Sequence, residues 1–186
     1  MICGQRYVRW SHIFETIEPG EYDVRIKVLK NGFTMQDAFE RLYKRSKHFT
    51  IENMDLLFYP YTLIEFDVDY GKKLDRLNGK VLVMCDMWRG DYSMARSKGE
   101  FVMTDAEDNT VMPTKISVDD AIANAPRTVY GEIQKAKRVL KIPDINYIKH
   151  DSVYKPFFIV ECLNDDKEVF HILFDTVTGE YSLLNA

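Results

Sequence analysis

The chain has 186 residues, of which 46% are hydrophobic and 13% aromatic, so it can bury a globular core and is not generally disordered. A net charge of −4 gives no long-range attraction for phosphate backbones, which argues against a nucleic-acid-binding protein. The chain has three cysteines, which are widely spaced and form no C-x-x-C pair, and this pattern favours a reducing compartment over a disulfide framework. Because no export signal or membrane-length apolar run is present, we predict a cytoplasmic protein without a membrane partner.

Residues 1–33 are predicted to form an N-terminal β-hairpin that packs on a first module. The segment Glu18-Pro19-Gly20-Glu21 fits a type II turn, because proline presets φ at the first central position and glycine accepts positive φ at the second. The return strand alternates between charged residues on one face and apolar residues on the other, at Tyr22, Val24, Ile26 and Val28.

Residues 34–95 are predicted to form the first module, a helix followed by antiparallel strands. Thr34 is a good N-cap, and apolar residues then recur at helical spacing, at Met35, Ala38, Phe39, Leu42 and Tyr43. Residues 54–70 read as a long strand, and residues 81–85 and 91–95 as two shorter ones. Proline cannot donate a hydrogen bond to a neighbouring strand, so Pro60 favours an edge position or a bulge.

Residues 96–116 are polar and irregular, and we predict a linker there. The second module, residues 117–186, opens on the N-cap Ser117, and its helical stripe is interrupted by Pro126. This proline predicts either a kink or a second helix with Pro126 in its first turn. Strands are expected at residues 145–149, 157–163, 169–174 and 180–184.

Three short sequence phrases occur once in each predicted module and in the same order. Each helix start carries a phrase like Ser117-Val118-Asp119-Asp120-Ala121-Ile122, each long strand has a Pro-aromatic-x-aliphatic-aliphatic-Glu phrase, and a later turn has Asp-x-x-x-Gly-acid-Tyr-Ser. The sequence therefore predicts an α+β fold, a tandem repeat of a helix packed on an antiparallel β-meander.

The second copy of these phrases resembles the PepSY-like family of small α+β modules. The resemblance is carried by Ser117–Ile122, by Pro156-Phe157-Phe158-Ile159-Val160-Glu161 and by Phe174-Asp175-Thr176-Val177-Thr178-Gly179-Glu180. It implies a helix packed on an antiparallel sheet and a non-catalytic role, commonly the regulation of a peptidase or another protein-binding task. It supplies no catalytic residues.

Four carboxylates occupy matching places in the two halves. Asp86 and Asp175 precede a glycine by four residues, which suits a turn in which the carboxylate accepts backbone N–H groups, and which also raises a metal or acid/base hypothesis. Glu65 and Glu161 lie on strands among apolar neighbours, where a raised pKa would suit an acid or base and where a solvent-facing or lysine-paired carboxylate is the alternative.

Aromatic residues are frequent near both predicted turns, and they form the candidate binding set Tyr61, Trp88, Tyr92, Phe157 and Tyr181. Tyrosine and tryptophan are favoured on recognition surfaces, so an aromatic sheet face or an edge strand at Pro60 or Pro156 is the predicted binding site. Packing of these aromatics between the two modules is the alternative that the sequence leaves open.

No nucleophile, nucleotide-binding or metal-binding motif occurs in the sequence, so we predict a protein that is not an enzyme and needs no cofactor or metal. The predicted function is non-catalytic binding of an unidentified protein or peptide. An alternative is small-molecule binding or hydrolysis in a cleft between the modules, with Glu65, Asp86, Glu161 and Asp175 as its polar groups. A second alternative is a structural homo-oligomer.

Overall fold

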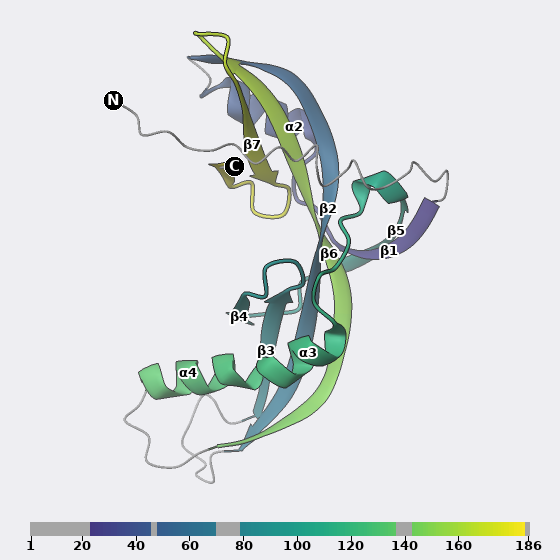
Figure 1. Cartoon of the computed structure of the whole chain (residues 1–186), viewed down its shortest axis with the longest axis vertical. Helices are drawn as coiled ribbons and strands as arrows, with labels where there is room; N and C mark the ends of the chain where they lie inside the picture. The colour runs from purple at the N-terminus through teal and green to yellow at the C-terminus, as the bar shows by residue number, and fades with distance from the viewer. Residues whose placement is uncertain (1–22, 46–47, 70–78, 137–142, 185–186) are drawn as a thin grey trace. The chain divides into compact units, whose positions relative to one another are not determined.

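A computed structural model of the chain describes residues 23–45, 48–69, 79–136 and 143–184 (Figure 1). The helices in these ranges are α2 (Met35–Tyr43), α3 (Val118–Asn124) and α4 (Pro126–Ala136), with a short 3-10 helix at Asp108–Thr110. The strands are β1 (Asp23–Leu29), β2 (Phe49–Asp69), β3 (Gly79–Asp86), β4 (Tyr92–Ala95), β5 (Phe101–Glu107), β6 (Asp144–Asn164), β7 (Val169–Asp175) and β8 (Tyr181–Leu183).

The strands of the described ranges form one eight-stranded sheet with the order β4-β3-β2-β6-β1-β5, and β7 pairs with β6 and β8. The chain divides into two compact units, and the long strands β2 and β6 each contribute residues to both. Unit 1 comprises the described parts of Met1–Tyr59, Phe101–Met112 and Lys155–Ala186, and unit 2 those of Pro60–Glu100 and Pro113–Tyr154.

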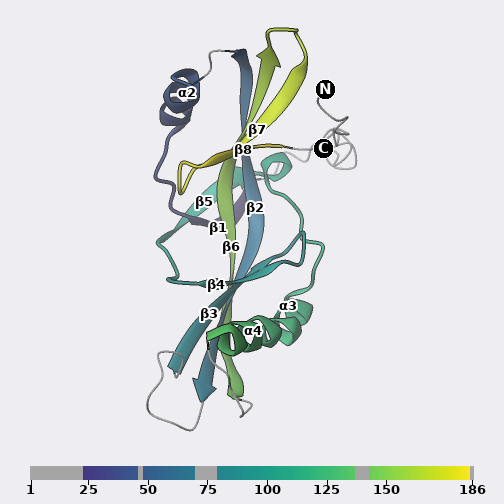
Figure 2. The same cartoon turned by 90° about the vertical axis from the view of Figure 1, so that its left-hand side faces the viewer.

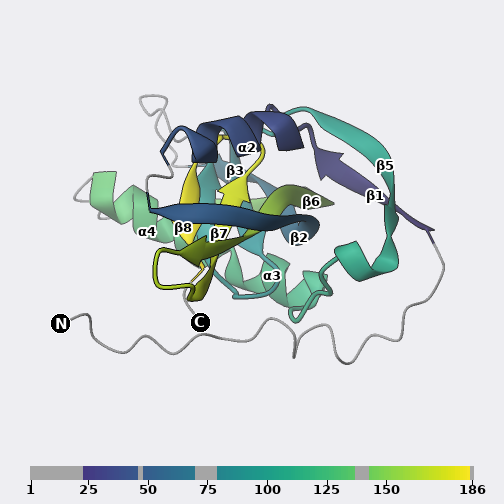
Figure 3. The same cartoon turned by 90° about the horizontal axis from the view of Figure 1, so that it is seen from above.

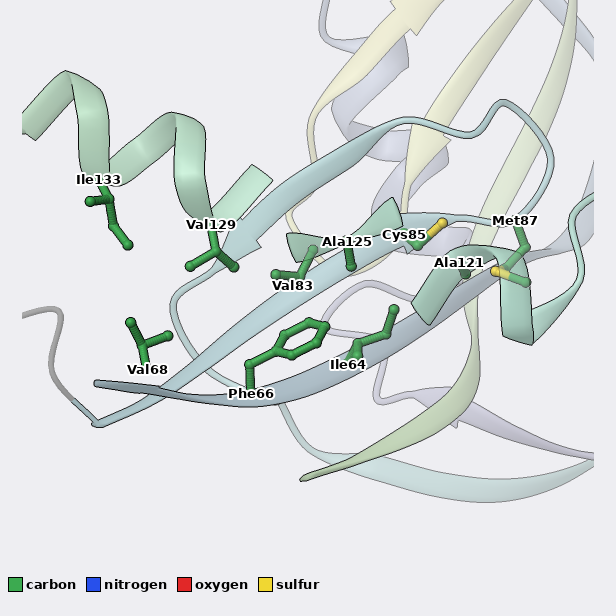
Figure 4. Packing of buried hydrophobic residues seen from close by; sticks show 10 residues of the cluster. All are labelled: Ile64, Phe66, Val68, Val83, Cys85, Met87, Ala121, Ala125, Val129 and Ile133. Carbon is green, nitrogen blue, oxygen red and sulfur yellow. The ribbon is translucent and has the colours of Figure 1, made fainter. Parts of the chain in front are cut away.

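The core of unit 2 joins strands from the first half of the sequence to helices from the second half. Figure 4 shows Val129 and Ile133 pointing from α4 toward apolar side chains of β2 such as Phe66. The helices follow from the sequence: the Ser117 hydroxyl accepts a hydrogen bond from the Asp120 N–H and starts α3, and Pro126 is the first residue of α4. The buried cluster is Ile64, Phe66, Val68, Val83, Cys85, Met87, Ala121, Ala125, Val129 and Ile133.

In the core of unit 1, a helix from the first half of the sequence packs mainly on strands from the second half, and apolar residues of β2 complete it at the edge. Thr34 caps α2 through a capping box with Asp37, and the helix buries Ala38 and Leu42 in a cluster with residues of β6 and β7. Figures 2 and 3 show α2 alongside the strands of unit 1. The buried cluster is Ala38, Leu42, Phe158, Val160, Cys162, Ile172 and Phe174.

The predicted tandem repeat of a helix on its own meander is therefore wrong. The described strands belong to one sheet, and the buried residues under each helix come from strands of the other half of the chain. Helix α2 shares a buried cluster with β6 and β7, with residues of β2 packed at its edge, whereas α3 and α4 share one with β2 and β3. The physical reason is that an amphipathic pattern specifies an apolar helix face without specifying the sheet that covers it.

Two turns, after β3 and after β7, have the same hydrogen bonds. The Asp86 carboxylate accepts the N–H groups of Trp88 and Arg89 at 2.9 and 2.7 Å, and the Asp175 carboxylate accepts those of Val177 and Thr178 at 2.9 and 3.1 Å. Gly90 and Gly179 have φ of 79° and 72°, which glycine adopts without steric cost. The turn chemistry predicted for both aspartates is present.

Each of these turns also holds the segment that leads into a helix. The Met87 carbonyl accepts the N–H groups of Lys115 and Ile116 at 2.9 and 3.1 Å. In unit 1, the Thr176 carbonyl accepts the N–H groups of Gly32 and Phe33 at 2.9 and 3.0 Å. The turn of one half of the chain therefore fixes the start of the helix from the other half.

Two local expectations need correction, and a third is not tested. The hairpin predicted for residues 1–33 has its first strand and turn outside the described residues, and its return strand β1 pairs with β5. Strand β5 lies in the segment 96–116, where we expected a polar, irregular linker. On α2, Met35, Phe39 and Tyr43 are 48%, 43% and 67% exposed, so the predicted apolar stripe is only half covered.

The edge position predicted for Pro60 and Pro156 is also wrong. Both prolines are buried within β2 and β6, which have neighbouring strands on two sides. A proline lacks only the N–H, and both carbonyl groups remain acceptors: that of Pro60 for the Met87 N–H at 3.2 Å and that of Pro156 for the Thr176 hydroxyl at 2.8 Å.

Candidate functional site

A surface pocket of about 510 Å³ in unit 2 contains one of the aromatic residues that the sequence singles out. It lies where the Asp86 turn meets the starts of α3 and α4, and its size falls in the range of ligand pockets. It is lined by Gly90, Tyr92, Lys115, Ile116, Asp120, Asn124, Arg127 and Thr128. We call it the Tyr92 pocket.

The local structure explains how these residues meet. The Asp86 turn places Gly90 just before β4 and Tyr92 at its first position, and its Met87 carbonyl accepts the N–H groups of Lys115 and Ile116. Pro126 then starts α4, so that Arg127 lies in the first turn of that helix. Segments far apart in the sequence are thus joined at one turn.

Trp88 lies beside the pocket and contacts one of its cations. The Lys115 ammonium is 3.6 Å from the centre of the Trp88 ring, a cation–π contact, and the ring is half-buried. The indole therefore restrains a positive charge at the pocket wall. Trp88 and Tyr92 are the two predicted binding residues that the structure brings to one place.

Tyr92 is anchored on the core side of the pocket. Its ring packs against the buried cluster of unit 2, and burial together with the hydrogen bond to Cys85 raises the pKa of its phenol to about 12. Burial likewise raises the pKa of the Cys85 thiol. Both groups are therefore neutral at physiological pH, and Tyr92 presents a fixed, uncharged aromatic wall.

Cations outnumber acids on the wall of the Tyr92 pocket. Lys115 and Arg127 line it, and the only acidic residue of its wall is Asp120. The Asp120 carboxylate is engaged locally, because it accepts a hydrogen bond from the Ser117 hydroxyl at 2.6 Å. An aromatic wall with two cations is suited to a ligand that has a carboxylate or another anionic group.

A second pocket of about 300 Å³ lies on the other face of β3 and β4. Glu65 of β2 is paired with Leu82 of β3, and Leu82 with Ala95 of β4, so these three side chains lie on one face of the sheet. The paired residues Cys85 and Tyr92 lie on the opposite face, which packs on the helices. We call it the Glu65 pocket. It is lined by Glu65, Lys80, Val81, Leu82, Met94, Ala95, Arg96, Ser97 and Lys98.

Glu65 is surrounded by lysines. Its side chain is 10% exposed, and Lys98, Lys80 and Lys149 approach its oxygens at 2.6, 3.7 and 4.0 Å. The hydrogen bond from Lys98, aided by the charges of the three lysines, lowers the pKa of Glu65. The raised pKa that an acid or base would need is not found, and the lysine-paired alternative is the one observed.

The other predicted site residues occupy different surroundings. Tyr61 is half-buried on β2, Phe157 is 8% exposed and makes an edge contact with Tyr59, and Tyr181 is 36% exposed and accepts a hydrogen bond from Arg45. Phe157 is thus a core residue of unit 1, whereas Tyr181 lies on its surface.

The remaining repeated carboxylates have partners within their own units. Lys155 contacts the Asp175 carboxylate at 2.5 Å, and Glu161 lies 3.5 Å from His171 on the exposed surface of β6 and β7. The wall of the Glu65 pocket has no second carboxylate. Within the described ranges, no group of three or more histidine, cysteine or acidic side chains is arranged to hold a metal ion.

Lys115 and Arg127 were not among the residues predicted from the sequence. Each lies close to a residue whose role the sequence does indicate: Lys115 is two positions before the N-cap Ser117, and Arg127 follows Pro126. A helix start that is preceded or followed by a basic residue is common, so this signal alone does not indicate a site.

No family model, curated protein or solved structure matches this chain. Among the described residues, no helix combines the length and apolarity that crossing a bilayer requires.

Proposed function

We propose that the protein is a non-catalytic binding protein and that it recognises an acidic segment of a partner protein at the Tyr92 pocket. The observation that carries this proposal is the convergence of Tyr92, Lys115 and Arg127 on one pocket beside Trp88. Aromatic side chains and arginine are the residue types that contribute most to binding at protein interfaces.

The energetics favour an anionic group of the partner in this pocket. Hydrogen bonds between a carboxylate and a lysine or arginine are stronger than those between neutral groups. Lys115 is restrained by the Trp88 ring before any ligand arrives, so less side-chain entropy is lost on binding. A positive pocket in a chain of net charge −4 also selects against basic partners.

Two further parts of the proposal rest on the sequence. The resemblance of the segments around Ser117, Pro156 and Gly179 to PepSY-like modules agrees with a non-catalytic, protein-binding role. We place the protein in the cytoplasm, because its cysteines are few and widely spaced, and because Cys85 and Cys162 are free thiols, as is common in a reducing compartment.

The proposal is tested with an array of immobilised short peptides in acidic, basic and uncharged classes. We expect wild-type protein to bind acidic peptides selectively, and the double variant K115A/R127A to lose about 10- to 100-fold in affinity, since two charge-assisted contacts are removed. The control is K135A, because Lys135 lies on α4 outside the pocket and pairs with Glu132.

Fluorescence locates the binding event. The chain has two tryptophans, Trp10 and Trp88, so W10F leaves Trp88 as the only reporter. Binding of an acidic peptide is expected to change the Trp88 emission in the W10F protein. Acidic-peptide binding that is equal in wild type and K115A/R127A refutes the proposal. So does the absence of selectivity for the acidic class.

A further inference from the structure

We propose that the partner segment binds as an added β-strand on β4 and that it places two acidic side chains, three residues apart, in the Tyr92 and Glu65 pockets. This inference rests on the proposed function, because it takes the Tyr92 pocket as the first contact. It adds the conformation of the partner, a second site and a sequence rule.

The first observation is that β4 ends the sheet. Within the described residues, the only strand paired with β4 is β3, through Leu82–Ala95 to Cys85–Tyr92. As far as the described residues go, the outer side of β4 therefore has no strand beside it, and its backbone N–H and C=O groups can pair with an extended chain. Addition of a strand to a sheet edge obtains affinity from main-chain hydrogen bonds and specificity from pockets for alternate side chains.

The second observation is that both pockets reach β4, at opposite faces of the sheet. Tyr92 lines one pocket on the helix-covered face, and Ala95 lines the other on the face of Glu65 and Leu82. Side chains of a strand alternate between faces, so residues opposite Tyr92 and Ala95 in an added strand point to different faces. Their separation is three residues, about 10 Å along the strand.

The third observation is charge. The wall of the Glu65 pocket has three cations, Lys80, Arg96 and Lys98, and a single carboxylate. Two further acids lie near it without lining it: Asp67 is opposite Lys80 in the β2–β3 register, and the charge of Asp151 acts on Lys98. On the wall itself, cations outnumber carboxylates three to one, with Lys98 and Lys80 also 2.6 and 3.7 Å from Glu65, and on the wall of the Tyr92 pocket they outnumber them two to one. An extended segment of the form acid-x-x-acid is complementary to both.

The test compares short peptides of identical composition that have two glutamates either three or two residues apart. The second spacing directs both side chains to one face, so that one pocket is left without its ligand group. We expect the acid-x-x-acid peptide to bind about ten-fold tighter, the effect of one charge-assisted contact. The double variant K80A/R96A is expected to abolish this difference while leaving the affinity of the other peptide unchanged.

Backbone pairing is tested on the peptide itself. N-methylation of an amide that faces β4 is expected to lower affinity by at least about ten-fold, since it removes a hydrogen bond and adds a clash. N-methylation of the next amide, which faces away from β4, is expected to have no effect. K135A again serves as the protein control, because Lys135 lines neither pocket.

Several outcomes separate this inference from the proposed function. Equal affinity for the two spacings, with binding still lost in K115A/R127A, retains the Tyr92 pocket and overturns strand addition. Competition by inorganic phosphate at the same concentration as the peptide shows a general oxyanion site and also overturns it. A third outcome is a dimer that forms as the protein concentration rises and that does not bind the peptide. This outcome shows that β4 pairs with a second copy of the chain and overturns the inference.

Discussion

Alanine substitutions at three glycines test whether each helix start packs on a turn from the other half of the chain. Gly179 has φ of 72°, and a Cβ there would lie 2.5 Å from the Phe33 ring and from the Arg41 guanidinium. Gly90 has φ of 79°, and its Cβ would lie 3.0 Å from the terminal methyl of Ile116. In helix α4, Gly131 has no atom within 4 Å of such a Cβ.

The magnitudes follow from these contacts. A left-handed backbone costs a non-glycine residue roughly 1–2 kcal/mol, which applies to G90A and G179A. Overpacking adds about 1–3 kcal/mol where the neighbour cannot move, which applies to G179A because an aromatic ring is in contact, and less to G90A because a methyl can rotate away. We expect losses of about 2–5 kcal/mol for G179A and roughly 1–2 kcal/mol for G90A. Removing a helix glycine is expected to stabilise G131A by about 0.5–1 kcal/mol.

The assay is equilibrium unfolding in urea, with the free energy of unfolding extrapolated to water. Far-ultraviolet circular dichroism at zero urea checks that each variant retains its fold. The expected order of stability is G131A above wild type, followed by G90A and then G179A. If G179A is no less stable than G90A, the Phe33 ring does not lie on the turn, and the exchange of helices between the halves of the chain is refuted.

Three further predictions address the core, the loss of stability at low pH and the reactivity of the thiols. Ile133→Ala is expected to lower the free energy of unfolding by about 2–4 kcal/mol in the same urea assay, because Ile133 is 2% exposed against β2; a loss below about 0.5 kcal/mol contradicts the assignment of α4 to this core. Burial would raise the pKa of Asp175, but the hydrogen bond and the charge of Lys155 outweigh burial and lower this pKa in the folded protein. The ionised Asp175 therefore stabilises the fold above its ordinary pKa of about 3.9, and this stabilisation is lost as the pH falls through the lower pKa of the folded state. In Asp175→Asn, the free energy of unfolding should therefore fall less steeply between about pH 5 and pH 2 than in the wild type. An unchanged pH dependence in this range contradicts the prediction. Burial raises the pKa of Cys162 to about 11 and that of Cys85 above its usual range, so in a C3S protein iodoacetamide should label neither thiol until urea is added, as mass spectrometry of digested peptides would show.

Local chemistry was predictable from the sequence because it depends on residues close together in the chain. Thr34 and Ser117 start helices, Pro126 opens α4, and Asp86 and Asp175 accept the N–H groups of their turns. Each of these features requires a particular side chain at a fixed short spacing. The matching phrases in the two halves reflect this local chemistry.

The partner of each helix was not predictable in the same way. An apolar stripe such as Val129 and Ile133 would fit the strands of either half, since both present β-branched and aromatic residues. The segments that lead into α3 and α2 are bonded to the Met87 and Thr176 carbonyls of turns in the other half of the chain, and a backbone carbonyl has no signature in the sequence. The same bonds bring Lys115 to the Tyr92 pocket, so the cations of the site were missed for the same reason.

The exchange of helices sets the order in which the cores are completed during synthesis. Strands β2 to β4 leave the ribosome before α3 and α4, and α2 leaves it before β6 and β7. Neither core can close until the second half of the chain has been made, although domains commonly fold as soon as they emerge. A nascent chain that ends before α3 would present Ile64, Phe66 and Val83 to solvent, which makes this intermediate a substrate for chaperones.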